Sequence, residues 1–445
     1  MTETFDDIDS AWHEAMQALA EADFHLTDAP LFLVLGSCTQ GEKVLFEAAQ
    51  LSFVVKQTPA DADAPIHVYA GSEGIYVTCP DASLLSRQAA LFASTRQEES
   101  TQEQHTIGVD SSEEDMFKTL QPKGQMKEVQ SILARAREQG RSPDQLTEEE
   151  KNQILTLVAG SVVPTASPIS TPSHASLLRD QQEVARLGRR LARVCELIVA
   201  GRQPYCPLNG ILLIVPFQAT SRGDLADETG ELCARDLDVC LAQTGVWCPR
   251  LMLLADMEQA TGFCEFIERF PKEQRVRRLG QRFPLAPDLP AEGWPEMIQG
   301  GCHWICQALF PNWVCKLLKL EPTGKETLDD VVRGNAKLFE LLSVMRQREK
   351  PLARIIVRGV LRHNDAPPMF AGCYVAATGS NHDKEQAFLP GVFRRLIEEQ
   401  NYVCWTDEIL AREAKYRFWA KVGYTIIALA VLAVVSLSGY VLYCL

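Results

Sequence analysis

The chain has 445 residues, of which 46% are hydrophobic, and its formal net charge is -14. This length is enough for two or three domains with hydrophobic cores, and the acidic balance excludes non-specific nucleic-acid binding, which depends on lysine and arginine. Fourteen cysteines are scattered along the chain without any Cys-x-x-Cys pair, which excludes a disulfide framework.

The first 94 residues are predicted to form the first part of an α/β domain. Apolar side chains at helical spacing indicate an amphipathic helix over residues 7–24. A continuous apolar run predicts a buried strand at residues 31–35, and a loop and a helix to about residue 50 follow it. Two further short strands are expected at residues 66–70 and 74–78.

The loop after the first strand has the spacing of a phosphate-binding loop, G-x-x-x-x-G-K-[ST]. Gly36 and Gly41 occupy the two glycine positions, but Glu42 stands at the lysine position and Lys43 at the hydroxyl position. The lysine of such a loop neutralises phosphate, whereas a carboxylate repels it. Lys43 lies about 100° further around the helix, so it does not simply replace the missing lysine. The loop is therefore predicted to be a degenerate nucleotide site.

Residues 95–180 differ from their surroundings and are predicted to be a polar, partly disordered insertion. Two modest helical patches, 125–139 and 145–159, precede a segment rich in serine, threonine and proline at 161–176. This composition is typical of a flexible linker, and the acidic stretch 94–115 begins the insertion.

Residues 181–270 are predicted to complete the α/β domain. The pattern indicates helices over about 181–200 and 223–244, with buried strands at 210–217 and 250–255. Strands that alternate with helices predict a mainly parallel sheet. The first of these helices has a basic face that we expect to be solvated, formed by Arg186, Arg189, Arg190 and Arg193.

Residues 271–420 are predicted to be a helix-rich extension, and Trp294, Trp304 and Trp313 are expected in its core. The segment 353–377 is mixed in character and precedes a helix that leads to the end of the chain. Cys302-His303-x-x-Cys306 is the nearest approach to a metal-ligand cluster. It lacks a second pair at zinc spacing, so we expect neither a metal site nor another cofactor.

Residues 421–445 are predicted to be a transmembrane helix. The run from 422 onward contains no charged residue and is long enough to cross about 30 Å of hydrocarbon. Positive flanks remain on the cytoplasmic side, which predicts a single-pass C-terminal anchor with the bulk of the chain in the cytoplasm. The basic flank consists of Arg412, Lys415, Arg417 and Lys421. Small residues that favour helix self-association are Ala430, Ser436 and Gly439.

The order of these elements resembles the cytoplasmic part of the IcmF/TssM family, inner-membrane components of type VI and type IVB secretion systems. The segments that support the resemblance are Leu31–Gly41, Glu73–Asp81, Pro207–Leu213, Ala255–Glu258 with Gly262-Phe263, and Met369–Val375. A Phe-x-x-x-Ile helix, Phe393 to Ile397, and an apolar helix follow them in the same order as in the family.

The resemblance implies a P-loop-NTPase-like α/β fold and allows the nucleotide site to be compared residue by residue. Thr78 stands at the magnesium-side aspartate and Asp81 at the glycine of the same motif. Asp256 replaces the base-reading lysine, and Glu258 replaces the base-reading aspartate. The acidic replacements are expected to repel a triphosphate. The degenerate nucleotide-binding residues that the sequence predicts are Gly36, Gly41, Lys43 and Glu258.

The chain is shorter than the family pattern at both ends, because we find neither a preceding pair of transmembrane helices nor a large periplasmic region. We therefore expect a non-enzymatic scaffold, anchored in the bacterial inner membrane, which binds a DotU/TssL-like inner-membrane protein. Two alternatives stay open. One is an active GTPase or ATPase switch that uses Lys43, and the other is a tail-anchored adaptor unrelated to secretion.

Overall fold

A computed structural model describes residues 5–106, 176–285, 291–319, 328–361 and 368–444. Contacts divide the chain into one unit of residues 1–95 with 176–445 and a second unit of residues 96–175. The helical patches 125–139 and 145–159 and nearly all of the segment 161–176 lie outside the described residues.

The described part of the first unit is built on one mixed sheet of eight strands in the order β2-β3-β4-β1-β5-β7-β9-β8. The central strands β4, β1, β5, β7 and β9 are parallel to one another, and β2, β3 and β8 pair antiparallel at the two edges. The prediction of a mainly parallel sheet is confirmed. The strands are β1 Leu31–Leu35, β2 Val55–Thr58, β3 His67–Gly71, β4 Gly74–Thr78, β5 Gly210–Pro216, β7 Arg250–Ala255, β8 Leu279–Arg282 and β9 Phe370–Val375.

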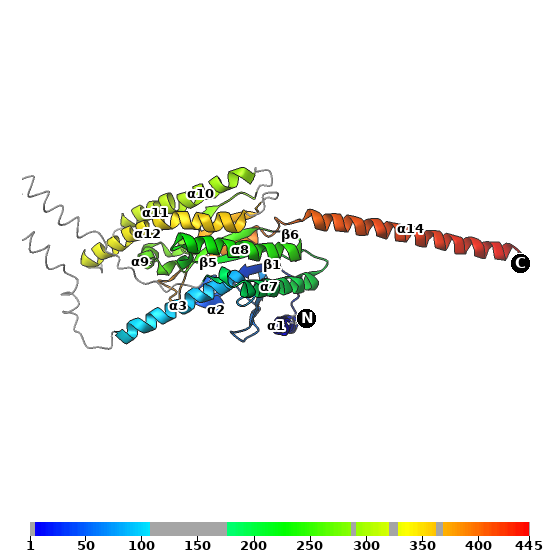
Figure 1. Ribbon diagram of the computed structural model, residues 1–445, viewed down its shortest axis with the longest axis horizontal. Helices are drawn as coiled ribbons and strands as arrows, with labels where there is room; N and C mark the ends of the chain where they lie inside the picture. Colours follow the sequence, from blue (N-terminus) through cyan, green and yellow to red (C-terminus); the bar gives the residue numbers. More distant parts are fainter. Residues whose placement is uncertain (1–4, 107–175, 286–290, 320–327, 362–367, 445) are drawn as a thin grey trace, which may run out of the picture. The chain divides into compact units, whose positions relative to one another are not determined.

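Helices cover both faces of this sheet (Figure 1), which explains why β1, β5 and β7 are buried at every residue. On one face, the rings of Phe46 of α2, Phe393 of α13 and Tyr76 of β4 pack against one another in tilted and edge-to-face contacts. Elsewhere, α7 packs against α8, and α8 packs along α12. The helices are α1 Asp6–Glu21, α2 Gly41–Ala48, α3 Leu84–Thr106, α7 Gln181–Arg202, α8 Gly223–Thr244, α9 Phe263–Arg269, α10 Trp294–Trp304, α11 Phe310–Leu318, α12 Leu328–Val360 and α13 Leu389–Glu398.

The stretch predicted as a helix-rich extension also contributes to the sheet. Strands β8 and β9 come from within residues 271–420 and pair with each other, and β9 pairs in parallel with β7. The mixed segment 353–377 resolves into the end of α12, which continues through Pro351 to Val360, and the buried strand β9. The sheet therefore extends well past residue 270.

One arginine on the basic face of α7 is not solvated as predicted. Arg190 is buried, and its guanidinium donates to the Asp81 carbonyl at 2.7 Å and to the Asp7 carboxylate at 2.6 Å. It thereby joins α7 to α1 and to the loop after β4, because a buried guanidinium requires acceptors for its N–H groups.

The C-terminal helix α14 spans Asp407–Cys444 and follows a two-stranded sheet of β12 Cys404–Trp405 and β6 Val246–Trp247. Within its portion Asp407–Ser436, an exposed 18-residue window has a mean hydropathy of 2.0. By length and composition this helix could cross a membrane (Figure 1). The helix begins before the predicted transmembrane span 421–445. Its first turns are polar and include the basic flank.

Candidate functional site

The loop between β1 and α2 contains the two glycines that the sequence predicts for a phosphate-binding loop. Gly36 has a φ of +89°, and a Cβ placed there would lie 2.0 Å from the Ile214 carbonyl oxygen on β5. Gly41 has a φ of +81° and open space around it, so only its backbone conformation requires glycine. The loop is thus held close to β5, and the Gly36 N–H donates to the Ser86 hydroxyl at 3.0 Å.

A carboxylate from the same chain binds the backbone of this loop. Asp256 follows β7, is fully buried and adopts a φ of +58°. The Thr39 N–H donates to its two carboxylate oxygens at 3.0 and 3.1 Å, and the Thr39 hydroxyl donates at 2.8 Å. The Thr378 hydroxyl donates to the same carboxylate at 2.9 Å. An internal anion therefore occupies a loop amide of the kind that binds phosphate in a functional P-loop.

Glu42, at the position of the missing lysine, points toward the sheet. Its carboxylate accepts a hydrogen bond from the Thr78 hydroxyl at 2.7 Å and lies 3.0 Å from His67 Nδ1. The other ring nitrogen of His67 lies 2.8 Å from the Asp61 carbonyl oxygen. Both ring nitrogens face acceptors, an arrangement that favours the imidazolium form.

The pKa of His67 reflects this arrangement. Burial by itself lowers the pKa of the imidazole, but the hydrogen bond and the charge of Glu42 outweigh it and raise the pKa above its ordinary value of 6.5. The side chains of His67 and Glu42 are only 4% and 12% exposed. Glu42 therefore has a buried partner on β3, and the two side chains form an ion pair when His67 is protonated.

Lys43, the alternative phosphate ligand, is exposed on α2. The structure therefore brings together Gly36, Gly41 and Glu258 at the carboxyl ends of β1 and β7, where ligands of open α/β sheets bind, and leaves Lys43 at the surface.

Glu258 lies in the short turn after Asp256, and its carboxylate accepts a hydrogen bond from the Thr378 N–H at 2.9 Å. Burial, with a further contribution from the Asp256 charge, raises the pKa of Glu258 to about 7. Glu258 is therefore hydrogen-bonded to the short strand β10, Ala377–Thr378. The same carboxylate would have to contact the base of a bound nucleotide.

Substitution of Glu258 by glutamine is expected to stabilise the protein at high pH. Because the pKa of Glu258 is raised in the folded state, ionisation of Glu258 above pH 7 lowers the stability of the protein. Below pH 4.5 the carboxyl group is protonated in both states, and this loss of stability is absent. Glutamine removes this cost and still accepts the Thr378 hydrogen bond. We expect a gain of about 1–2 kcal/mol at pH 8 and no gain at pH 4.5, measured by thermal unfolding at the two pH values. An equal effect at both pH values would contradict this assignment.

Asp81 does not contribute the repulsion that the sequence predicts. Its carboxylate oxygens lie 3.2 Å from Arg190 and 3.5 Å from Arg186 on α7. These guanidinium groups compensate its charge, since oppositely charged groups at this separation attract. Asp81 therefore belongs to the contact between α7 and the loop after β4.

Several residues that shape the site are not recognisable from the sequence. Thr39 and Thr378 are ordinary hydroxyl residues until the fold places them on Asp256. Asp236 of α8 accepts hydrogen bonds from the Ser83 hydroxyl and from the N–H groups of Leu84 and Leu85, at the start of α3. Burial raises the pKa of Asp236 to about 6. The only sequence signal was an acidic residue within an otherwise apolar helix face.

The cysteine and histidine group at 302–306 forms no metal cluster among the residues that the structure describes. Cys302 and Cys306 are buried, whereas His303 Nδ1 lies 3.1 Å from Glu349 of α12. Cys302 and Cys306 lie one turn apart on the buried face of the helix, whereas the adjacent His303 lies on its exposed face.

Comparison with known proteins identifies one family. The sequence model of the IcmF-related N-terminal domain matches residues 185–395. The matched region extends from α7 to α13 and includes Asp256 and Glu258, but it does not include the loop at 36–43. No curated protein and no solved structure matches the chain.

Proposed function

Because residues 185–395 make this chain a member of the IcmF/TssM family, we propose that it is a non-enzymatic scaffold of a type VI-like secretion complex in the bacterial inner membrane. In this proposal the α/β domain descends from a P-loop NTPase and has lost nucleotide binding. The family membership supports a secretion-associated component, and the geometry of the loop supports the loss of nucleotide chemistry.

The observation that supports this proposal best is the hydrogen bonding between Thr39 and Asp256. A nucleotide phosphate needs the loop amides as donors, but the Thr39 N–H already donates to a buried carboxylate. Entry of a phosphate would place a second anion beside Asp256, which is unfavourable in a buried site. Glu42 cannot relieve this, because it is itself anionic and is bonded to His67 and Thr78.

The membrane anchor of the proposal is α14. Its apolar stretch is exposed along the residues whose side chains the structure describes, so no described element of the protein covers it. The basic residues at its start favour a cytoplasmic location for the α/β domain. Within the membrane, Ala430 and Ser436 provide small residues for contact with a second copy of the helix.

The proposed partner is a DotU/TssL-like inner-membrane protein. The test is co-expression of the full chain with such a protein, followed by detergent extraction and purification through a tag on the partner. We expect the full chain to co-purify in a fixed ratio, and a variant that lacks residues 407–445 to lose membrane association. Failure of the full chain to co-purify, with both proteins present in the membrane, would contradict the partner assignment.

The alternative of an active switch makes a different prediction. If Lys43 bound the phosphates, Lys43→Ala would abolish nucleotide binding. Because Lys43 is exposed on α2, we expect the variant and the parent to give the same result in a filter-binding assay with radiolabelled GTP and ATP. A nucleotide signal in the parent that the variant lacks would favour the switch.

A further inference from the structure

Four basic side chains form a row along α12. Arg346, Lys350, Arg354 and Arg358 recur at every fourth residue, and all four are exposed. Residues four apart lie on the same face of a helix, so this row extends over about 18 Å. Like charges at this spacing repel one another and give the isolated helix no stability. Asp227 of α8 offsets this repulsion only in part, because the exposed side chains of the row keep N–H donors that can bind a further anion.

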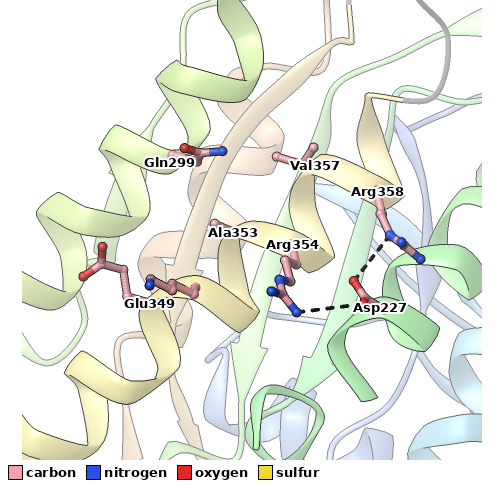
Figure 2. Close-up of a pocket in the computed structure, with 8 residues that line it drawn as sticks. Asp227, Gln299, Glu349, Ala353, Arg354, Val357 and Arg358 are labelled. Atoms are coloured by element: carbon pink, nitrogen blue, oxygen red, sulfur yellow. Dashed lines mark ion pairs between the residues drawn. The ribbon is translucent and has the colours of Figure 1, made fainter. Parts of the chain in front are cut away.

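Three members of the row, Lys350, Arg354 and Arg358, line a cavity of about 650 Å³ between α12, α8 and α10. Figure 2 shows Arg354 and Arg358 on one side, Asp227 of α8 facing them, and Gln299 of α10 across the cavity. Ala353 and Val357 of α12 contribute apolar surface. A ligand that fits this cavity has anionic groups along one side and an apolar group beside them.

The acidic residues of the cavity are already engaged. Asp227 lies 3.4 Å from Arg358 and 3.9 Å from Arg354, and both arginine side chains remain 55% exposed. Glu349 accepts a hydrogen bond from Gln307 at 2.9 Å and lies 3.1 Å from His303. The arginine and lysine row thus retains N–H donors that face solvent at the rim of the cavity.

We propose that this cavity, together with the row from Arg346 to Arg358, binds an acidic amphipathic helix of a partner protein. Carboxylates that recur every fourth residue on such a helix match the spacing of the row, and an apolar side chain beside them fits against Ala353 and Val357. A peptide is favoured over nucleic acid, because the apolar lining at Ala353 and Val357 fits an apolar side chain, which nucleic acid does not offer. The proposal is independent of the nucleotide loop.

The test uses the full chain in detergent micelles and a fluorescent synthetic peptide. The peptide is helical, with glutamate at every fourth residue over three turns and leucine in the adjacent stripe. The control peptide has glutamine in place of glutamate. We expect the acidic peptide to bind, and Arg354→Glu with Arg358→Glu to weaken binding by about tenfold or more in fluorescence anisotropy. A peptide with lysine in place of glutamate is expected to bind this double variant.

Arg333→Glu is the matched control, because Arg333 is exposed on the same helix but outside the row. It should leave the affinity unchanged. Equal binding of the glutamine peptide, an equal loss in the Arg333 variant, or no rescue by the lysine peptide would overturn the proposal. Displacement of the peptide by anionic vesicles or by duplex DNA at equal charge would also overturn it. Binding only after removal of residues 107–175 would assign the cavity to the chain's own insertion and contradict a partner protein.

Discussion

Replacement of Asp256 by alanine is expected to destabilise the protein by about 3–4 kcal/mol, the largest effect that the site predicts. The substitution removes the acceptor for the Thr39 N–H, the Thr39 hydroxyl and the Thr378 hydroxyl. These groups lie in a buried or half-buried part of the fold. In the variant their N–H and O–H donors would bond neither to the carboxylate nor to water, which lowers the free energy of unfolding. Thermal unfolding of the variant and the parent measures this loss.

Asp224→Ala is a suitable control for this experiment. Asp224 is an exposed aspartate at the start of α8, and it pairs with the exposed Arg222 at 2.7 Å. Surface pairs of this kind contribute little, so the control is expected to stay within about 0.5 kcal/mol of the parent. A destabilisation by Asp256→Ala no larger than that of the control would show that the carboxylate does not hold the loop.

Replacement of Glu42 by glutamine is expected to cost about 1.5–3 kcal/mol at pH 6 and less at higher pH. The pKa of His67 is raised in the folded state, so the Glu42–His67 pair stabilises the fold fully below pH 6.5. This contribution is lost as the pH rises through the higher pKa of the folded state. The difference between parent and variant should therefore be largest at low pH and smaller at pH 9.

The pH series of thermal unfolding distinguishes this pair from a purely steric role of Glu42. A difference that does not change between pH 6 and pH 9 would mean that the charge on His67 contributes nothing. His67→Gln provides the reciprocal control, because it removes the titrating group. In this background the stability difference between Glu42 and Glu42→Gln should no longer change with pH.

The buried centre of the sheet could be predicted from the sequence because its signals are local. The apolar runs at Leu31–Leu35 and at residues 210–217 are continuous, and strands buried on both faces show this pattern. The glycines at 36 and 41 were predicted by spacing, and both adopt positive φ. The apolar stretch of α14 was equally evident from its length and lack of charge.

The rest depended on contacts between distant parts of the chain. Strand β8 has four residues, and only Leu279 of these is buried, so its pairing with β9 leaves almost no pattern in the sequence. The hydrogen bonds between Thr39 and Asp256 join residues that are 217 positions apart. They exist because β1, β5 and β7 are parallel neighbours, which places the ends of β1 and β7 at one edge of the sheet.

The direction of a side chain was also beyond the sequence. Glu42 and Asp81 were both predicted to repel a triphosphate, but Glu42 is paired with His67 and Asp81 with Arg186 and Arg190. The fold places a basic side chain beside each of these two carboxylates. Because a buried carboxylate without a partner is costly, this pairing explains how the loop tolerates both residues.

Isothermal titration calorimetry of the full chain with GTP and with ATP, each in the presence of Mg²⁺, tests the central claim most directly. With Asp256 bound to the loop and Glu42 at the lysine position, we predict no saturable heat up to about 1 mM nucleotide, a limit that corresponds to roughly 4 kcal/mol of binding free energy. Saturable, Mg²⁺-dependent binding in the micromolar range would contradict the account and would show that the loop still binds phosphate.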